Sequence, residues 1–146
     1  MVGVVVVVVA LVVATVFGVV WRRRNGRLRP QPATGPEVTD DRARLSAADL
    51  GVDSLGERST LVQFSSAFCA PCRATRRILD EVAQMVDGVR YVEIDAESRL
   101  DLVRRLGVLR TPTVLVLDGA GRIVRRGSGQ PRKPDIVAAL GVAITS

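Results

Sequence analysis

The stretch TLVQFSSAFCAPCR occupies residues 60–73 of this chain. Its first five residues are mostly apolar or β-branched, which predicts a buried strand. From 73 to 86 apolar residues recur at helical spacing, which predicts a helix with one buried face. Cys69 and Cys72 are the only cysteines of the protein, and they lie where the strand ends and the helix begins.

This placement predicts different reactivities for the two cysteines. The N-terminal end of a helix carries unpaired N–H groups and the positive end of the dipole, which favour a thiolate at Cys69. Thiolates in such places are the reactive ones. Pro71 fits the first helical turn, where its missing N–H costs no hydrogen bond. Cys72 is placed to attack a mixed disulfide formed at Cys69 and release the product.

With its FCAPC motif, the chain resembles the thioredoxin family, which has a tryptophan and then Cys-Gly-Pro-Cys at this place. A second element, Thr111–Pro112 followed by an apolar run at 114–117, strengthens the resemblance, which covers about 43–141. It implies an α/β thioredoxin-like fold with a mixed central sheet flanked by helices. It also implies a protein-disulfide oxidoreductase with a redox-active Cys69–Cys72 disulfide and a cis Pro112 lying against the cysteines.

The resemblance also assigns residues that support the active site. Phe68 stands in place of the tryptophan and is expected to pack beside the motif as an apolar rim for partner docking, with a core position as the alternative. Backbone groups of Thr111 are expected to pair with a substrate strand. Ala70 and Pro71 separate the cysteines. Gly127 and Gly129 are expected to lie in a loop that flanks the site, with turn geometry as the alternative reason for glycine there.

Besides Phe68 and Ala70, two positions in the strands depart from the family pattern. Gln63 stands where thioredoxins carry a buried aspartate, and an amide cannot take up a proton. Tyr91 replaces the partner lysine of the next strand. Proton transfer from Cys72 is therefore expected to use water or another carboxylate, for which Glu93 is a candidate.

Composition excludes several other classes of function. Of 21 basic residues, five arginines cluster at 22–29; without them 16 basic residues face 15 acidic ones, which argues against a nucleic-acid partner. The chain has no histidine, and two sulfurs cannot complete a zinc site within one chain. A metal shared across a dimer stays open as an alternative. Neither a cofactor nor a metal is expected.

The N-terminal 21 residues are almost uninterrupted valine, leucine and alanine. About 20 such residues at 1.5 Å each span roughly 30 Å, the thickness of a bilayer core. Trp21 and three arginines follow at the expected interface. We therefore expect a single-pass anchor in the cell membrane, rather than a cleaved signal peptide, which has its basic residues before the apolar stretch. The arginines place the C-terminal domain in the cytoplasm by the positive-inside rule.

The rest of the chain follows a predicted order of elements. The expected domains are the transmembrane anchor at 1–21, a basic, proline-rich linker at 22–42 and the thioredoxin-like domain at 43–146. Within that domain we expect a short helix capped by Ser46, a strand at 89–95, a helix starting at Ser98 and stopped by Gly107, a strand at 114–117, a turn at 118–121, a strand at 122–126, a loop at 127–134 and a helix at 136–144.

The leading hypothesis is a membrane-tethered thiol–disulfide oxidoreductase. Its partners would be disulfide-containing protein substrates, an upstream dithiol reductant and the lipid bilayer through residues 1–21, and its oligomeric state stays open. One alternative is an extracytoplasmic exchange protein that serves cytochrome maturation or disulfide formation. Another is a non-catalytic membrane-bound binding module in which the cysteines are incidental.

Overall fold

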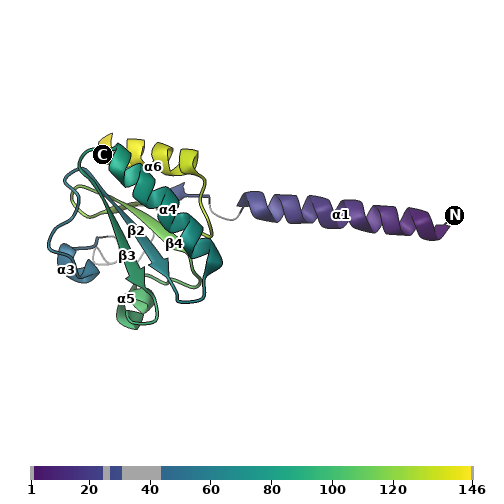
Figure 1. Cartoon of the computed structure of the whole chain (residues 1–146), viewed down its shortest axis with the longest axis horizontal. Helices are drawn as coiled ribbons and strands as arrows, with labels where there is room; N and C mark the ends of the chain where they lie inside the picture. The colour runs from purple at the N-terminus through teal and green to yellow at the C-terminus, as the bar shows by residue number, and fades with distance from the viewer. Residues whose placement is uncertain (1, 25–26, 31–43, 146) are drawn as a thin grey trace, which may run out of the picture.

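A computed structural model describes residues 2–24, 27–30 and 44–145 (Figure 1). The helices of this part of the chain are α1 (Val2–Arg24), α3 (Ala47–Leu50), α4 (Ala70–Met85), α5 (Leu100–Arg105) and α6 (Lys133–Thr145). Its strands are β1 (Arg29–Pro30), β2 (Ser59–Ser65), β3 (Val89–Asp95), β4 (Thr113–Asp118) and β5 (Ile123–Ser128).

The strands form one sheet in the order β1-β5-β4-β2-β3. The edge strand β3 runs parallel to its neighbour β2, and the other neighbours are antiparallel, so the sheet is mixed. Side chains of a strand alternate between the two faces of a sheet. In β2 this alternation sends Val62 and Phe64 to one face and Leu61 and Gln63 to the other.

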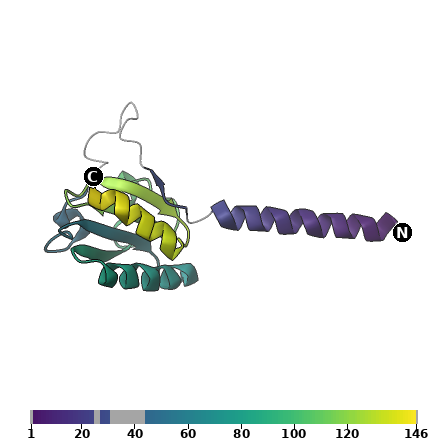
Figure 2. The same ribbon diagram turned by 90° about the horizontal axis from the view of Figure 1, so that it is seen from above.

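Helices cover both faces of the sheet. Val62 and Phe64 join a buried apolar cluster with residues of α3, α5, β3, β4 and β5. Leu61 joins a second cluster, whose helical members come from α4 and α6, and these two helices pack against each other (Figures 1 and 2). The layers therefore match the mixed, helix-flanked sheet that the sequence predicts.

Several predicted boundaries differ from the structure. α5 begins at Leu100, because the Ser98 hydroxyl donates to the backbone oxygen of Asp95 in a turn that precedes the helix. β5 continues to Ser128, so Gly127 belongs to a strand and the prediction that it lies in a loop is wrong. α6 begins at Lys133, three residues before the predicted start.

Part of the segment expected to be linker joins the sheet. Arg29 and Pro30 pair antiparallel with β5, and the side chain of Leu28 packs against the α4–α6 cluster. Proline is tolerated here because an edge strand can spare an N–H. The remainder of the expected linker lies mainly outside the described residues.

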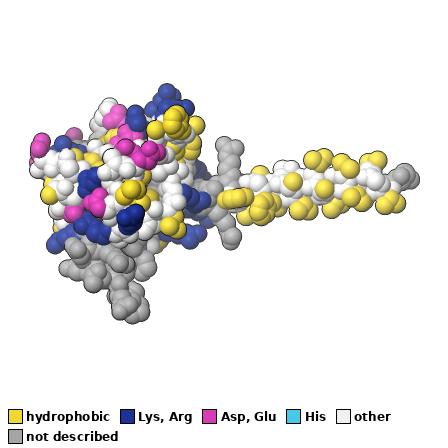
Figure 3. Space-filling model, turned by 90° about the horizontal axis from the view of Figure 1, so that it is seen from below, with side chains coloured by type: hydrophobic (Ala, Val, Ile, Leu, Met, Phe, Trp, Pro, Cys, Tyr) yellow, Lys and Arg dark blue, Asp and Glu magenta, His cyan; other side chains and the backbone are white. Residues whose placement is uncertain are grey.

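α1 contains a span, Val2–Trp21, that is long and apolar enough to cross a membrane. None of this span is buried, and Figure 3 shows hydrophobic side chains along the whole helix. A signal sequence near the N-terminus can be as long and as apolar as this span.

Candidate active site

The two cysteines form a disulfide at the first turn of α4. Cys69 is the N-cap of this helix, and its Sγ accepts a hydrogen bond of 3.2 Å from the N–H of Cys72. Cys69 is 9% exposed and Cys72 is 2% exposed, so the first sulfur is the more accessible one. The helix end therefore already directs an N–H group at the sulfur on which negative charge would form.

The second element of the resemblance, Thr111–Pro112, contacts the turn that precedes this motif. Its peptide bond is cis, as the resemblance predicts. The hydroxyls of Thr111 and Ser66 are hydrogen-bonded at 3.0 Å, which joins this loop to the turn before Cys69. The N–H of Gly129 donates to the Pro112 oxygen at 2.7 Å, so Gly129 does flank the site.

Gln63 connects the sheet to the second cysteine. It is buried, and its amide nitrogen donates to the backbone oxygen of Cys72 at 2.9 Å. The Tyr91 hydroxyl donates to the amide oxygen of Gln63 at 3.0 Å. Burial, followed by the nearby charge of Glu93, raises the pKa of Tyr91, so this hydroxyl keeps its proton and acts as a donor. The two strand positions that depart from the family pattern thus form one hydrogen-bonded pair.

Glu93 makes its contacts away from the cysteines. One oxygen of its carboxylate accepts a hydrogen bond from the Ser65 hydroxyl and forms an ion pair with Arg76, each at 2.7 Å. Among the described residues, no hydrogen bond joins Glu93 to Cys69 or Cys72. The structure therefore gives no support for Glu93 as the proton acceptor of Cys72.

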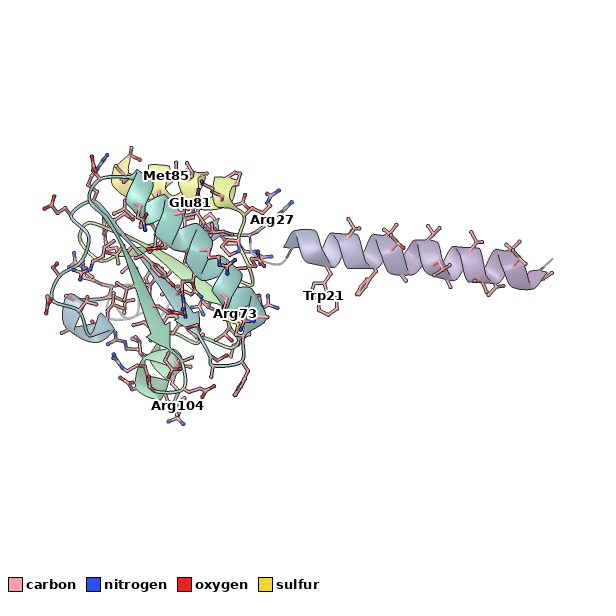
Figure 4. The ribbon with its side chains drawn as sticks, viewed as in Figure 1. Trp21, Arg27, Arg73, Glu81, Met85 and Arg104 are labelled. Carbon is pink, nitrogen blue, oxygen red and sulfur yellow. A yellow bond between two sulfur atoms is a disulfide. The ribbon has the colours of Figure 1, made fainter. Side chains whose placement is uncertain are left out.

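Two large apolar side chains project into solvent from the segments before Cys69 and before the Thr111–Pro112 loop. Phe68 is 100% exposed, so it neither packs beside the motif nor enters the core, and both expectations for its packing are wrong. Leu109, which precedes the Thr111–Pro112 loop, is 94% exposed. Sequence reasoning missed Leu109, although an apolar residue beside a proline loop was a signal for it. The base of α4 also carries Arg73, which is exposed (Figure 4).

The described residues contain no cluster of three or more histidine, cysteine, aspartate or glutamate side chains that could hold a metal ion. The pair of sulfurs is bonded to itself, and its neighbours are a glutamine, hydroxyls and backbone groups. The arrangement therefore suits reversible exchange of a disulfide.

Comparison with known proteins agrees with this geometry. Residues 50–141 match the family model described as Thioredoxin. Thioredoxin of Alicyclobacillus acidocaldarius is 29% identical over 86 residues, which cover 58% of this chain and 81% of that protein. Thioredoxin of Bacillus subtilis is 32% identical over 74 residues, which cover 50% of this chain and 70% of that protein.

A solved structure shows the same fold. A mutant thioredoxin from Halobacterium salinarum aligns with a TM-score of 0.56 at 18% identity, over 60% of this chain and 76% of that one. The family model spans more than half of the chain and includes the cysteine pair and the cis proline. The chain therefore belongs to the thioredoxin family and is a protein-disulfide oxidoreductase with its cysteine pair in the disulfide form.

Proposed function

We propose that this protein is a membrane-tethered thiol–disulfide oxidoreductase that reduces disulfide bonds of partner proteins through Cys69 and Cys72. The observation that carries the proposal is the hydrogen bond from the Cys72 N–H to the Cys69 sulfur at the N-terminus of α4. After reduction, the same N–H and the helix dipole favour the thiolate at Cys69.

The reaction proceeds by two exchanges. The Cys69 thiolate attacks one sulfur of the partner disulfide, which forms a mixed disulfide and releases the other partner sulfur as a thiolate. The Cys72 thiolate then attacks the Cys69 sulfur, which closes the Cys69–Cys72 disulfide and releases the second partner thiolate. Two electrons pass to the partner, its thiolates take protons from water, and an upstream dithiol protein returns the oxidised pair to the reduced state.

The burial of Cys72 suits its role as the resolving thiol. A partner reaches the more exposed Cys69 first, and Cys72 is held below it by the Gln63 hydrogen bond to its backbone. Because Gln63 cannot accept a proton, the proton of Cys72 leaves to water. Ala70 and Pro71 form the turn that keeps the two sulfurs within bonding reach.

A substrate strand would lie between the two loops of the site. Backbone groups of Thr111, beside the cis Pro112, pair with the strand next to Cys69. Phe68, next to Cys69, and Leu109, before the Thr111–Pro112 loop, supply exposed apolar surface, which suits contact with an apolar segment of the partner. This surface replaces the packed apolar rim that the sequence predicted at Phe68.

α1 supplies the tether in this proposal. Its span of 20 apolar residues is unburied, and arginines follow it directly. By the positive-inside rule the domain faces the cytoplasm, where the reducing environment drives electrons toward the partner. The reverse orientation would make the protein an extracytoplasmic exchange enzyme for cytochrome maturation or disulfide formation.

The exchange is tested by trapping. In the full-length C72A variant the mixed disulfide at Cys69 cannot be resolved, so partner proteins accumulate as reductant-sensitive adducts. The matched control is the C69A/C72A double variant, which forms none. If C72A recovers no more adducts than the double variant, exchange through Cys69 is excluded and the binding-module alternative gains support.

The orientation is tested separately in intact cells. A cysteine is introduced at exposed Glu97 in a chain whose native cysteines are serines, and a membrane-impermeant maleimide is applied. A cytoplasmic domain is labelled only after lysis. Labelling of intact cells would place the domain outside, and recovery of a chain without α1 would identify a cleaved signal sequence.

A further inference from the structure

The strand register brings the segment that follows α1 to the disulfide end of the sheet. Arg29 pairs with Arg126, so the antiparallel register continued by two residues sets Arg27 beside Ser128. Gly127 allows this approach, because a Cβ there would lie 2.9 Å from the Leu28 side chain and 3.1 Å from the Arg27 oxygen.

Ser128 in turn lies in line with the active site across the sheet. It pairs with Thr113, the residue after the cis proline, and Thr113 pairs with Phe64, close to where β2 leaves the sheet toward Cys69. Neighbouring strands are about 4.8 Å apart, so Arg27 and Phe64 are separated by about 14 Å across three steps. The chain therefore enters the domain at the disulfide end of the sheet. This is the side from which α1 projects (Figure 4).

A pocket of about 360 Å³ lies at this edge. Four arginines line it: Arg27 and Arg29 before and in β1, Arg110 beside the cis-proline loop, and Arg126 in β5. Its other described lining residues are Pro30, Gly127 and Ser128, so none of them is acidic. We call these four arginines and the space between them the arginine pocket.

The guanidinium of Arg126 has neutral partners among the described residues. It donates to the backbone oxygens of Leu106 and Gly107, which are neutral acceptors. Burial without an acidic partner lowers the pKa of Arg126, because the charged form is poorly solvated there. An anion in the pocket would supply the missing charge, and guanidinium groups match the paired oxygens of a phosphate.

The position of the pocket, close to the end of α1, indicates which molecule supplies that phosphate. Two residues separate Arg24, the end of α1, from Arg27, so the three peptide steps between them span at most about 11 Å. If α1 crosses the bilayer, Arg27 and Arg29 lie within reach of the lipid headgroups. An acidic peptide would have no comparable reason to be present at this edge.

We propose that the arginine pocket binds the phosphate of an anionic phospholipid headgroup and docks the disulfide end of the domain on the membrane surface. This inference rests on the proposed tethering by α1. Docking holds Cys69 near the bilayer, so the favoured substrates are proteins whose disulfides lie close to the membrane surface.

The test uses the full-length protein in nanodiscs that contain phosphatidylcholine and increasing fractions of phosphatidylglycerol. A trace of phosphatidylglycerol with a photoreactive headgroup is included, and cross-linking to the peptide that contains Arg126 and Ser128 is measured by mass spectrometry. We expect saturable cross-linking that unlabelled phosphatidylglycerol competes away and inorganic phosphate does not.

The R29Q/R110Q variant removes one arginine from each side of the pocket. Each basic side chain near an anionic surface contributes about fivefold to binding, so half-maximal cross-linking should need about tenfold or more phosphatidylglycerol. The matched control is R77Q/R104Q, which makes the same change in net charge on exposed arginines of α4 and α5. Neither Arg77 nor Arg104 is among the described residues that line the pocket, so the control should need much less additional phosphatidylglycerol than R29Q/R110Q.

The other outcomes overturn the proposal in distinguishable ways. Equal loss in both variants means general charge attraction, competition by inorganic phosphate means a free-anion site, and competition only by a glutamate-rich peptide means a peptide site. If the chain does not copurify with nanodiscs, the tether itself fails and the inference fails with it. If the chain does copurify but shows no saturable cross-linking, lipid binding by the arginine pocket is refuted. The proposed function is not affected by that outcome.

Discussion

The two ends of the central sheet differ in how fully their side chains are buried and hydrogen-bonded. At the end formed by the β4–β5 turn, buried polar groups are bonded. The Ser59 hydroxyl donates to the Leu117 oxygen at 2.6 Å, and the Thr60 hydroxyl accepts from the Gly56 N–H at 2.9 Å. The Asp118 carboxylate accepts from the N–H of Ala120 and from the backbone and guanidinium of Arg122. We call this the closed end.

The disulfide end has exposed apolar side chains and one unpaired buried hydroxyl. Phe68 and Leu109 are exposed, none of the described residues that line the arginine pocket is acidic, and the hydroxyl of buried Thr75 in α4 has no hydrogen-bond partner among the described residues. The closed end thus contributes stability, and the disulfide end keeps surface and polar groups available for partners. Substitutions at the two ends should therefore separate stability from activity.

The largest effect is expected at the disulfide end. C69S removes the nucleophile, so reduction of a model protein disulfide should fall to the uncatalysed rate. The unfolding free energy should fall by about 2 kcal/mol at most, since the bridge closes a short loop. The contrast is S59A at the closed end, which should lower stability and leave activity of the folded protein intact. Residual catalysis by C69S would remove Cys69 from the role assigned to it.

The second effect is expected at the closed end. Gly121 has a φ of +83°, and a Cβ there would lie 2.2 Å from the Leu45 oxygen. G121A should therefore cost about 2–5 kcal/mol in unfolding free energy, from the left-handed backbone and the clash together. The control G107A has a similar φ of +58° with nothing within 4 Å, and should cost about 1–2 kcal/mol. Urea unfolding that gives equal losses would show that the closed end is not tightly packed.

The third prediction concerns acid stability. Burial alone would raise the pKa of Asp118, but hydrogen bonds from Arg122 and Ala120 outweigh it and lower the pKa below the ordinary value. The stability from ionised Asp118 is therefore present above about pH 4 and is lost as the pH falls through the folded-state value.

The variant D118N should lower the unfolding free energy at neutral pH by about 1–2 kcal/mol, and the difference from wild type should shrink in acid. The control is D53N, because Asp53 is exposed and its side chain makes no hydrogen bond among those described. Unfolding curves recorded across the acid range measure both variants. If the loss of unfolding free energy in D118N stays constant with pH, ionised Asp118 is not the source of the stability.

The smallest effect compares two buried threonines. T75V removes a hydroxyl without a partner, so the disulfide form should keep its stability or gain up to about 1 kcal/mol. T60V removes the acceptor of the Gly56 N–H and should cost about 1–3 kcal/mol. Thermal unfolding of the two variants under oxidising conditions gives the comparison directly. A loss for T75V as large as that for T60V would mean that Thr75 has a structural role after all.

Regular elements of the fold were predictable because their patterns are local. The alternation in 89–95 gave the bounds of β3 as the structure has them, and Ser46 caps α3 with a reciprocal bond to Asp49, as expected for a capped short helix. The position of Cys69 at a helix N-terminus was predictable because a strand-like apolar run precedes the CAPC motif and apolar residues at helical spacing follow it.

The remaining features depend on contacts distant in sequence. β1 is two residues long and contains a proline, so only its pairing with β5 identifies it as a strand. The Arg76–Glu93 ion pair joins a helix to a strand, and no spacing rule connects them. Phe68 lies in the turn before a helix, where periodicity gives no information about exposure. The pairing of Tyr91 with Gln63 required the register of β2 and β3.

The central claim is that the N-terminus of α4 prepares Cys69 as a nucleophile. The direct measurement is the alkylation rate of each cysteine in the reduced full-length protein at neutral pH, followed by mass spectrometry against a free cysteine peptide. We expect Cys69 to react roughly fivefold faster than the peptide or more, and buried Cys72 to react more slowly. A Cys69 that reacts no faster than the free peptide would contradict this claim.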